Sequence, residues 1–160
     1  MPPVARTVWR ITTAPFAAQA FSGEGARQYG GRWNPKGLPV VYTAASPSLA
    51  LLEMLVQDAP LRARYVLIPA QLPEDLAETR IEIAQLPKDW RTIGTRDALQ
   101  ALGHRWLCSR ETAVLNVPSA VVPVERNILL NPAHPDFACL LIGEPQSLET
   151  DTRLMRNMAR

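Results

Sequence analysis

Residues 40–53 read VVYTAASPSLALLE, a strand-forming stretch followed at once by a helix-forming one. The first four residues are β-branched or aromatic, which is typical of a strand. Ser46 offers a side-chain oxygen to the free N–H groups at a helix start, and Pro47 fits the first turn because its nitrogen carries no hydrogen. We therefore predict a strand followed directly by a helix, whose apolar stretch, residues 49–56, ends before Pro60.

An acidic residue stands within this apolar helix. Glu53 has Leu49 and Ala50 one turn behind it and Val56 and Gln57 one turn ahead. We expect the carboxylate to face inward or toward a cleft, where its burial is costly unless a partner compensates. The alternative is a glutamate at the rim of the apolar stripe, paired with a surface arginine.

A glycine-rich turn precedes the strand. Residues 30–37 read GGRWNPKG, so two glycines stand directly before Arg32, and Trp33 follows it. Glycine lets a backbone approach a ligand closely, and arginine holds phosphate oxygens in a fork. An ordinary turn with a solvated arginine is the alternative. Tyr42, in the strand that leads to Glu53, is a further candidate, although most strand tyrosines are simply packed with the hydroxyl reaching water.

The rest of the chain is expected to alternate short strands with turns, because fifteen prolines and eight glycines interrupt it. A first strand over residues 8–11 precedes a long loop over residues 12–37, which we expect to be functional and to contain a short helix at residues 15–20. A second helix begins after Thr95. Its apolar stripe consists of Leu99, Leu102 and Trp106. Further strands are predicted at residues 64–70, 81–84, 114–117, 120–124, 128–130 and 139–142.

These elements indicate one α+β domain over residues 1–160. The formal net charge of +2 is too small an excess to indicate a nucleic-acid surface. Two histidines and no ligand spacing lead us to expect no metal site. Cys108 and Cys139 lie in apolar surroundings and are expected to be buried and reduced. No apolar run is long enough for a signal peptide or a membrane span, so we expect a cytoplasmic protein that does not bind membranes.

Two polar residues in the last third are weaker candidates for a site. Ser119 lies between Pro118 and Ala120, and Asn127 precedes an apolar run. Either could be an ordinary hydrogen-bonding residue of a turn or a strand edge. No Gly-x-Ser-x-Gly elbow surrounds Ser119, and no P-loop or dinucleotide-fold glycine fingerprint occurs. The residues alone therefore do not identify a substrate.

Several segments, in this order, resemble the signature of the RES-domain toxins, a family named for its arginine, glutamate and serine positions. The segments are GGRWNPKG (30–37), VYTA (41–44), LALLE (49–53), VPSAVVP (117–123) and ERNILLNP (125–132). The resemblance extends from residue 8 to about residue 143 and places Arg32, Tyr42, Glu53 and Ser119 at family positions.

This resemblance implies a fold similar to that of ADP-ribosyltransferases, with a split, twisted β core, an NAD⁺ cleft and surrounding helices. It also implies the toxin of a toxin–antitoxin system, which consumes NAD⁺ until a cognate antitoxin with an Xre-type or related helical region blocks it. Family members differ in the acceptor of the ADP-ribosyl group, which is water or phosphate for some and a protein for others.

One carboxylate is enough for this chemistry, because nicotinamide leaves the ribose as a neutral molecule and needs no general acid. By the resemblance, Glu53 would stabilise the positive charge that develops on the ribose, and Arg32 would bind a phosphate of the pyrophosphate. Tyr42 would stack on nicotinamide or donate a hydrogen bond to the phosphate, and Trp33 belongs to the same predicted binding set. The residues expected to position ribose or carboxamide groups are Ser119 and Asn127.

Other functions stay open at this point. A mono-ADP-ribosyltransferase that modifies a host protein would use the same residues. A module that binds NAD⁺, ADP-ribose or a partner without cleavage would leave the placement of Glu53 unexplained. A nuclease is disfavoured by the weak net charge and by the lack of an acidic cluster or a histidine pair. Residues 148–156 are either a short amphipathic helix that docks a partner or a frayed end.

Overall fold

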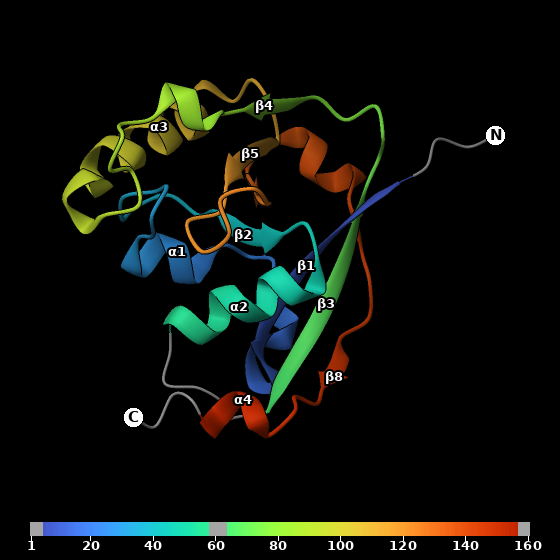
Figure 1. Ribbon diagram of the computed structural model, residues 1–160. Coiled ribbons are helices and arrows are strands. Elements are labelled where there is room, and N and C mark those ends of the chain that lie inside the picture. Colours follow the sequence, from blue (N-terminus) through green and yellow to red (C-terminus); the bar gives the residue numbers. More distant parts are fainter. Residues whose placement is uncertain (1–4, 58–63, 157–160) are drawn as a thin grey trace.

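The computed structural model describes residues 5–57 and 64–156, and these form one mixed sheet with helices packed around it (Figure 1). The strands are β1 (Arg6–Thr13), β2 (Val41–Ala44), β3 (Tyr65–Leu72), β4 (Glu78–Arg80), β5 (Val114–Pro118), β6 (Arg126–Leu130), β7 (Leu141–Ile142) and β8 (Gln146–Leu148). The α-helices are α1 (Glu24–Tyr29), α2 (Pro47–Gln57), α3 (Arg96–Ser109) and α4 (Arg153–Arg156). Short 3₁₀ helices are η1 (Ala14–Gln19), η2 (Ile83–Gln85), η3 (Ile93–Thr95) and η4 (Pro135–Cys139). The predicted α+β class is confirmed.

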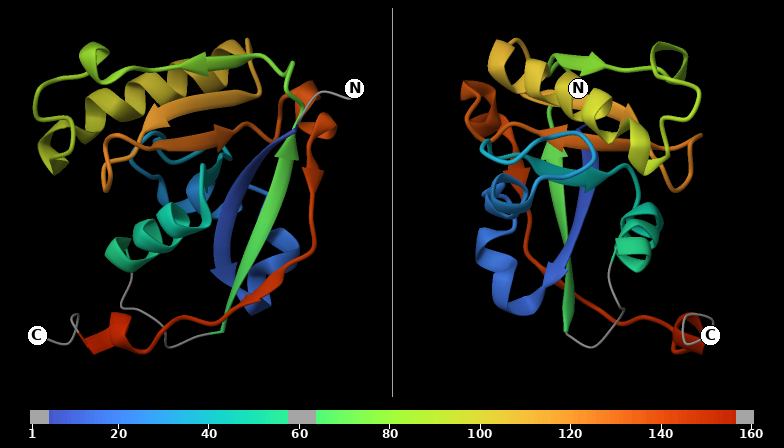
Figure 2. Two further views of the ribbon diagram at one scale, coloured as in Figure 1. Left: turned by 45° about the vertical axis from the view of Figure 1, so that its right-hand side comes forward. Right: turned by 90° about the vertical axis from the view of Figure 1, so that its left-hand side faces the viewer.

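The order of the strands is β4-β5-β6-β2-β1-β3-β7, with β8 also paired to β3. Strands β4 and β5 run parallel, and the other pairs are antiparallel. Strand β1 pairs with β3 over eight residues, whereas β1 and β2 meet in the described residues only at Trp9 and Ala44. The sheet is therefore split between β1 and β2, and Figure 2 shows the β1–β3 pair crossing the other strands steeply.

Alternating side chains of the central strands supply a core on each face of the sheet. In β6, Ile128 and Leu130 pack into one cluster with Val8, whereas Leu129 packs into the other with Trp106. The first cluster is covered by η1 and η4, and the second by α3 and the segments that carry Trp33 and Trp90. Residues 128–130 of β6 are therefore buried on both faces of the sheet, which fixes the register of β6 against β2.

The predicted helix start at Ser46 is confirmed, because its hydroxyl accepts a hydrogen bond from the backbone N–H of Leu49 at 3.1 Å. The end of this helix was expected before Pro60, which lies outside the described residues; the helix is described as far as Gln57. The stripe predicted for α3 is also confirmed, with Leu99 and Trp106 buried. Its start follows Thr95 as expected, but the Thr95 hydroxyl donates to the carbonyls of Asp89 and Thr92 instead of capping the helix.

Three predicted strands are wrong in whole or in part. Residues 120–124 form a turn, because the hydroxyl of Ser119 captures the N–H groups that a strand would pair. Residues 83–85 form η2, which a reciprocal capping box between Glu82 and Gln85 stabilises. Of residues 139–142, only the last two belong to a strand.

Two other expectations are corrected. The loop over residues 12–37 is largely structured, since β1 extends to Thr13 and is followed by η1 and α1. Cys108 and Cys139 are exposed rather than buried: Cys108 lies on the outer side of α3, with its Sγ 3.4 Å from His104 Nε2. Within residues 148–156, only Arg153–Arg156 is helical.

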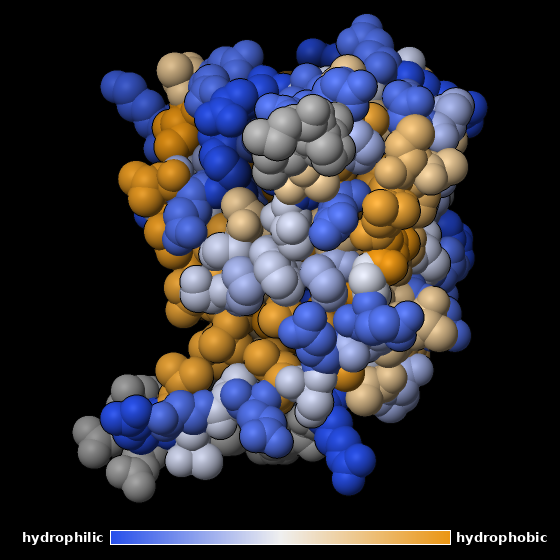
Figure 3. Space-filling view, turned by 90° about the vertical axis from the view of Figure 1, so that its right-hand side faces the viewer, coloured by the Kyte–Doolittle hydropathy of each residue, from blue (hydrophilic) through white to orange (hydrophobic). Residues whose placement is uncertain are grey.

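No helix in the described ranges is long and apolar enough to span a membrane. The face shown in Figure 3 carries apolar patches interrupted by polar side chains rather than one continuous apolar surface. Large apolar side chains that are exposed include Leu141 and Ile142 of the edge strand β7.

Candidate active site

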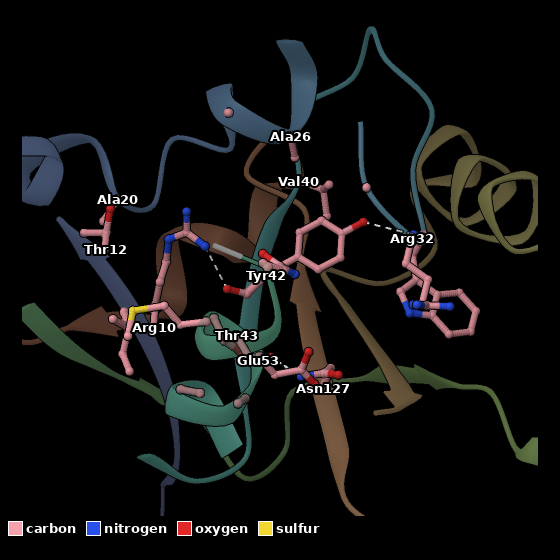
Figure 4. A pocket seen from close by; sticks show the side chains of 18 of the residues that line it. Arg10, Thr12, Ala20, Ala26, Arg32, Val40, Tyr42, Thr43, Glu53 and Asn127 are labelled. Atoms are coloured by element: carbon pink, nitrogen blue, oxygen red, sulfur yellow. Dashed lines mark hydrogen bonds between the residues drawn. The ribbon is translucent and has the colours of Figure 1, made fainter. Parts of the chain in front are cut away.

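A cleft of about 860 Å³ opens where β1 and β2 diverge (Figure 4). Its walls come from β1, α1, the turn at residues 30–33, β2, α2 and the segment that joins β5 to β6. The volume lies within the usual range of small-molecule sites, about 300–1,000 Å³. Five of the predicted site residues line this cleft: Arg32, Trp33, Tyr42, Glu53 and Asn127.

The predicted carboxylate faces the cleft with a hydrogen-bond partner behind it. Glu53 is half-buried, and its Oε1 accepts a hydrogen bond of 2.7 Å from the hydroxyl of Ser119. Ser119 is fully buried, and its oxygen accepts two hydrogen bonds of 3.0 Å from the N–H groups of Val121 and Val122. The structure describes no ion pair for Glu53, so the alternative of a rim glutamate paired with a surface arginine does not hold in the described residues.

Ser119 therefore acts on Glu53 rather than on the cleft itself. Its single hydroxyl hydrogen goes to the carboxylate, and its side chain does not line the cleft. The hydroxyl fixes one carboxylate oxygen and leaves the rest of the group to meet a ligand. Such a carboxylate needs no reorganisation when positive charge develops nearby.

The phenol of Tyr42 is held by residues 33 and 34 of the turn that carries Arg32, which we call the arginine turn. Its hydroxyl accepts a hydrogen bond from the backbone N–H of Trp33 at 3.1 Å and donates one to Asn34 Oδ1 at 2.5 Å. Burial raises the pKa of Tyr42 well above its ordinary value of 10.0. The hydroxyl hydrogen is thus already engaged, and the ring is the part of Tyr42 that is left to contact a ligand.

Arg32 also lines the cleft, and it lies on the other side of the Tyr42 ring from Arg10 (Figure 4). Its Nη1 donates long hydrogen bonds to the carbonyls of Trp90 (3.4 Å) and Arg91 (3.3 Å). Burial lowers its pKa, and the nearby charge of Arg96 acts in the same direction, whereas that of Glu53 opposes it. A guanidinium among other guanidinium groups suits an anionic ligand.

The other two predicted residues are placed differently from each other. Trp33 is only 2% exposed and packs into the core beside α3, so its ring anchors the turn. Asn127 lies at the cleft, where its Nδ2 donates a 3.3 Å hydrogen bond to the carbonyl of Thr43.

Arg10, which was not predicted from the sequence, also belongs to the site. It extends from β1 into the cleft, and its Nη1 donates a 2.9 Å hydrogen bond to the carbonyl of Tyr42. Its Nε is buried without a hydrogen-bond partner, and burial lowers the pKa of the guanidinium. A signal was available, because strand alternation places Arg10 on the same side as the core residue Val8. A cation on the inner face of a strand needs a partner, which a ligand can supply.

The cleft, its carboxylate and its guanidinium groups can be compared with known proteins. A family model described as the RES domain matches residues 7–151. The chain belongs to the RES domain family. The resemblance noted in the sequence is thereby confirmed.

Curated relatives of this RES chain carry informative names. "Toxin Res" of Yersinia enterocolitica serotype O:8 / biotype 1B is 38% identical over 150 residues, which is 92% of this chain and 98% of that protein. "Prs ADP-ribosylating toxin" of Sphingobium sp. (strain YBL2) is 36% identical over 155 residues, with 92% and 96% covered. "NAD(+) phosphorylase MbcT" of Mycobacterium bovis is 45% identical over 112 residues, with 61% and 59% covered.

A solved structure supports the fold of the RES chain. The crystal structure of the M. tuberculosis MbcT–MbcA toxin–antitoxin complex contains a chain that matches with a TM-score of 0.73 and 24% identity. The match covers 98% of this chain and 90% of that one. The predicted ADP-ribosyltransferase-like architecture, a split and twisted sheet with surrounding helices, agrees with this likeness.

Proposed function

We propose that this RES-domain chain is the toxin of a toxin–antitoxin system and cleaves the nicotinamide–ribose bond of NAD⁺. The ADP-ribosyl group then passes to water, phosphate or a protein. The observation that carries the proposal is the carboxylate of Glu53, which Ser119 holds in place at a cleft lined by guanidinium groups. The names of the relatives, an ADP-ribosylating toxin and an NAD(+) phosphorylase, support the same substrate.

The reaction requires little acid–base catalysis by the protein. When the bond between the ribose C1 and the pyridinium nitrogen breaks, its electron pair stays with nicotinamide, which leaves neutral. Positive charge develops on the ribose ring, and Glu53 stabilises it directly or through the ribose hydroxyls. Fixed charge of this kind contributes about 3–4 kcal/mol in other enzymes. A water molecule that takes the ribosyl group releases one proton, whereas a phosphate dianion attacks without losing one.

The anionic half of NAD⁺ matches the cationic walls of the cleft. Arg32 contacts a phosphate of the pyrophosphate, and Arg10, which also lines the cleft, is a second guanidinium donor for the same substrate. The ring of Tyr42 stacks on nicotinamide, and Asn127 offers its amide to the ribose or the carboxamide. NAD⁺ is the substrate here and not a resident cofactor, and the proposed chemistry uses no metal.

The test is the release of nicotinamide from NAD⁺ by the purified chain, freed of any antitoxin and followed by chromatography. We expect release by the wild-type protein and a loss of about 100-fold or more in the Glu53→Gln protein. Glu24→Gln is the matched control, because Glu24 lines the same cleft but pairs with Arg27, and this protein should stay active. Equal release by wild-type and Glu53→Gln proteins, or none in water, phosphate buffer or lysate, would overturn the proposal.

A specific observation favours a second function with the same first step. The relative that is 36% identical is named for ADP-ribosylating Prs, so a protein acceptor is the main alternative to water and phosphate. Labelled NAD⁺ in a cell lysate separates these outcomes: the label stays on a protein after transfer and appears as free ADP-ribose or its phosphate otherwise. Binding of NAD⁺ without release of nicotinamide would instead favour a non-enzymatic module.

The partner of the toxin is an antitoxin protein. Its Xre-type or related helical region is inferred from the family resemblance, and the MbcT–MbcA complex supports a partner of the antitoxin kind. Growth arrest on expression of the chain, relieved by co-expression of its cognate antitoxin, is the expected result. Arrest by the Glu53→Gln protein would contradict an enzymatic origin of toxicity.

A further inference from the structure

We propose that Asn34 is a positioning residue that holds the Arg32 turn against the cleft, and that it acts through the hydroxyl of Tyr42. The substrate role of Arg32 rests on the proposed function. Asn34 is fully buried and does not line the cleft, so it cannot contact a ligand there.

The side chain of Asn34 makes three hydrogen bonds within the protein. Its Nδ2 donates to the carbonyls of Ala26 (2.9 Å) and Pro35 (3.1 Å), and its Oδ1 accepts from Tyr42. Its own backbone carbonyl accepts a 2.9 Å hydrogen bond from the N–H of Gly31. One amide therefore joins α1, the turn and β2, and only an uncharged amide of this length can donate twice and accept once here.

The turn fits tightly around this network. A Cβ atom at Gly31 would lie 2.7 Å from the Tyr42 hydroxyl oxygen and 2.9 Å from Asn34 Oδ1, so no larger residue fits. On the other side, Gln100 of α3 donates a 2.8 Å hydrogen bond to the Gly31 carbonyl. The backbone next to Arg32 is thus fixed from both sides.

Arg32 needs this support because its own contacts are weak. Its two hydrogen bonds, at 3.3 and 3.4 Å, go to neutral carbonyls and are longer than the usual range of about 2.7–3.2 Å for N–H···O hydrogen bonds. The direction of the guanidinium is therefore set by where the turn places its Cα. Losing the Asn34 network should displace Arg32 without removing it.

The experiment is a double-mutant cycle on NAD⁺ affinity, measured by calorimetry in the Glu53→Gln background so that no substrate is consumed. Asn34→Ala and Arg32→Ala should each weaken binding by about 10-fold, the loss expected for one charge-assisted contact. The double variant should be no weaker than Arg32→Ala alone, because Asn34 acts only through Arg32. Additive losses, or an Asn34→Ala protein that melts earlier but binds NAD⁺ as before, would overturn the proposal.

Tyr42→Phe gives a milder variant that keeps the ring, in case Asn34→Ala does not fold. It should raise KM for NAD⁺, and its effect should also vanish in the Arg32→Ala background. Hydrogen exchange of the Gly31 and Trp33 amides tests the network without any substrate. Faster exchange in the Tyr42→Phe protein supports the proposal, and an unchanged rate refutes it. A wild-type chain that does not bind NAD⁺ at all refutes the proposed function instead.

Discussion

The hydroxyl of Ser119 donates a hydrogen bond to Glu53, which lies 66 positions earlier in the chain. Residue chemistry and the family resemblance were enough to name Glu53 and Ser119, but not to predict that they pair. Ser119 was predicted to contact the ribose, but its hydroxyl donates to the Glu53 carboxylate and its side chain is buried. The sequence did not predict this burial, because it depends on the packing of distant segments. Arg10 was missed for a related reason, since a lone arginine in a strand becomes informative only once the inner face is known.

Ser119→Ala should impair both activity and folding stability. The Glu53 carboxylate loses its fixed orientation, so kcat should fall about 100-fold, as for other small misplacements of reacting groups. The N–H groups of Val121 and Val122 lose their acceptor, which should lower the free energy of unfolding by about 1–3 kcal/mol. Nicotinamide release and urea denaturation measure the two effects, and normal kcat in a destabilised protein would contradict the role assigned to Ser119.

Arg10→Met tests the guanidinium that has an unpaired buried Nε. Affinity for NAD⁺ should fall about 10- to 100-fold through the lost charge-assisted contact, while stability should hold because a poorly compensated buried charge is removed. Arg6→Met is the matched control, since Arg6 lies on the same strand but pairs with Glu78 and does not line the cleft. Equal affinities of the two variants would argue against a substrate role for Arg10.

Tyr42 should make the fold sensitive to alkali. The raised pKa of its phenol means that, above about pH 10, the unfolded chain loses a proton that the folded chain keeps. The unfolded state is then favoured, and the free energy of unfolding should fall by about 1.4 kcal/mol per pH unit from this residue. Denaturation between pH 9 and pH 11, with Tyr42→Phe against the exposed Tyr29→Phe, should show a shallower decline for Tyr42→Phe alone.

Most elements could be predicted from local sequence patterns, because the structure that the residue types favour is also the one in which they are buried or capped in the fold. The stretch from Val41 to Gln57 folds as its residue types indicate, with the strand buried and the helix capped by Ser46. The run at residues 120–124 is just as apolar, yet it forms a turn. The hydroxyl oxygen of Ser119 accepts the N–H groups of Val121 and Val122, and the carbonyl of Val122 accepts the N–H of Glu125. β-branched residues predict a strand only where backbone partners are free to pair with them.

Helix α3 and the arginine turn approach each other so closely that a methyl group would separate them. A Cβ atom at Gly103 would lie 1.6 Å from the carbonyl oxygen of Trp33, and backbone cannot move aside as a side chain can. Gly103→Ala should therefore lower the free energy of unfolding by about 1–3 kcal/mol and weaken NAD⁺ binding through the displaced turn.

The control for this substitution is Gly25→Ala in α1, where nothing lies within 4 Å of the added carbon. This variant should be about 0.5–1 kcal/mol more stable than wild type, because alanine favours a helix more than glycine does. Thermal unfolding of both proteins checks the pair. A Gly103→Ala protein as stable as wild type would mean that the turn does not rest on α3.

At the scale of the molecule, the cleft results from how strands distant in sequence are paired. Strand β1 pairs fully with β3 but meets β2 at a single residue pair, and the space between them is where the site residues gather. No local pattern encodes this divergence, since it depends on β2 pairing with β6 more than 80 positions away. The sequence therefore predicted most of the elements and most of the residues that line the cleft, whereas the shape of the site required the assembled fold.

NAD⁺ should stabilise the whole molecule, because in the proposed binding mode it contacts both sides of this divergence. For the Glu53→Gln protein, NAD⁺ at about 100 times its dissociation constant should add about 2.7 kcal/mol to the free energy of unfolding. That corresponds to a rise in Tm of about 5–10 °C for a domain of this size. Thermal scans with NAD⁺, with nicotinamide alone and with ADP-ribose measure the effect, and an unchanged Tm in all three would show that the cleft does not bind the dinucleotide.

The spread of the site along the chain also bears on its synthesis. A ribosome that has reached residue 118 has made Arg10, Arg32 and Glu53, but not the serine that holds the carboxylate or the strand that pairs with β2. A prematurely terminated product therefore carries the carboxylate without its cleft. We expect such fragments to be harmless to the cell that makes them, because toxicity would begin only after β6 has left the ribosome and folded.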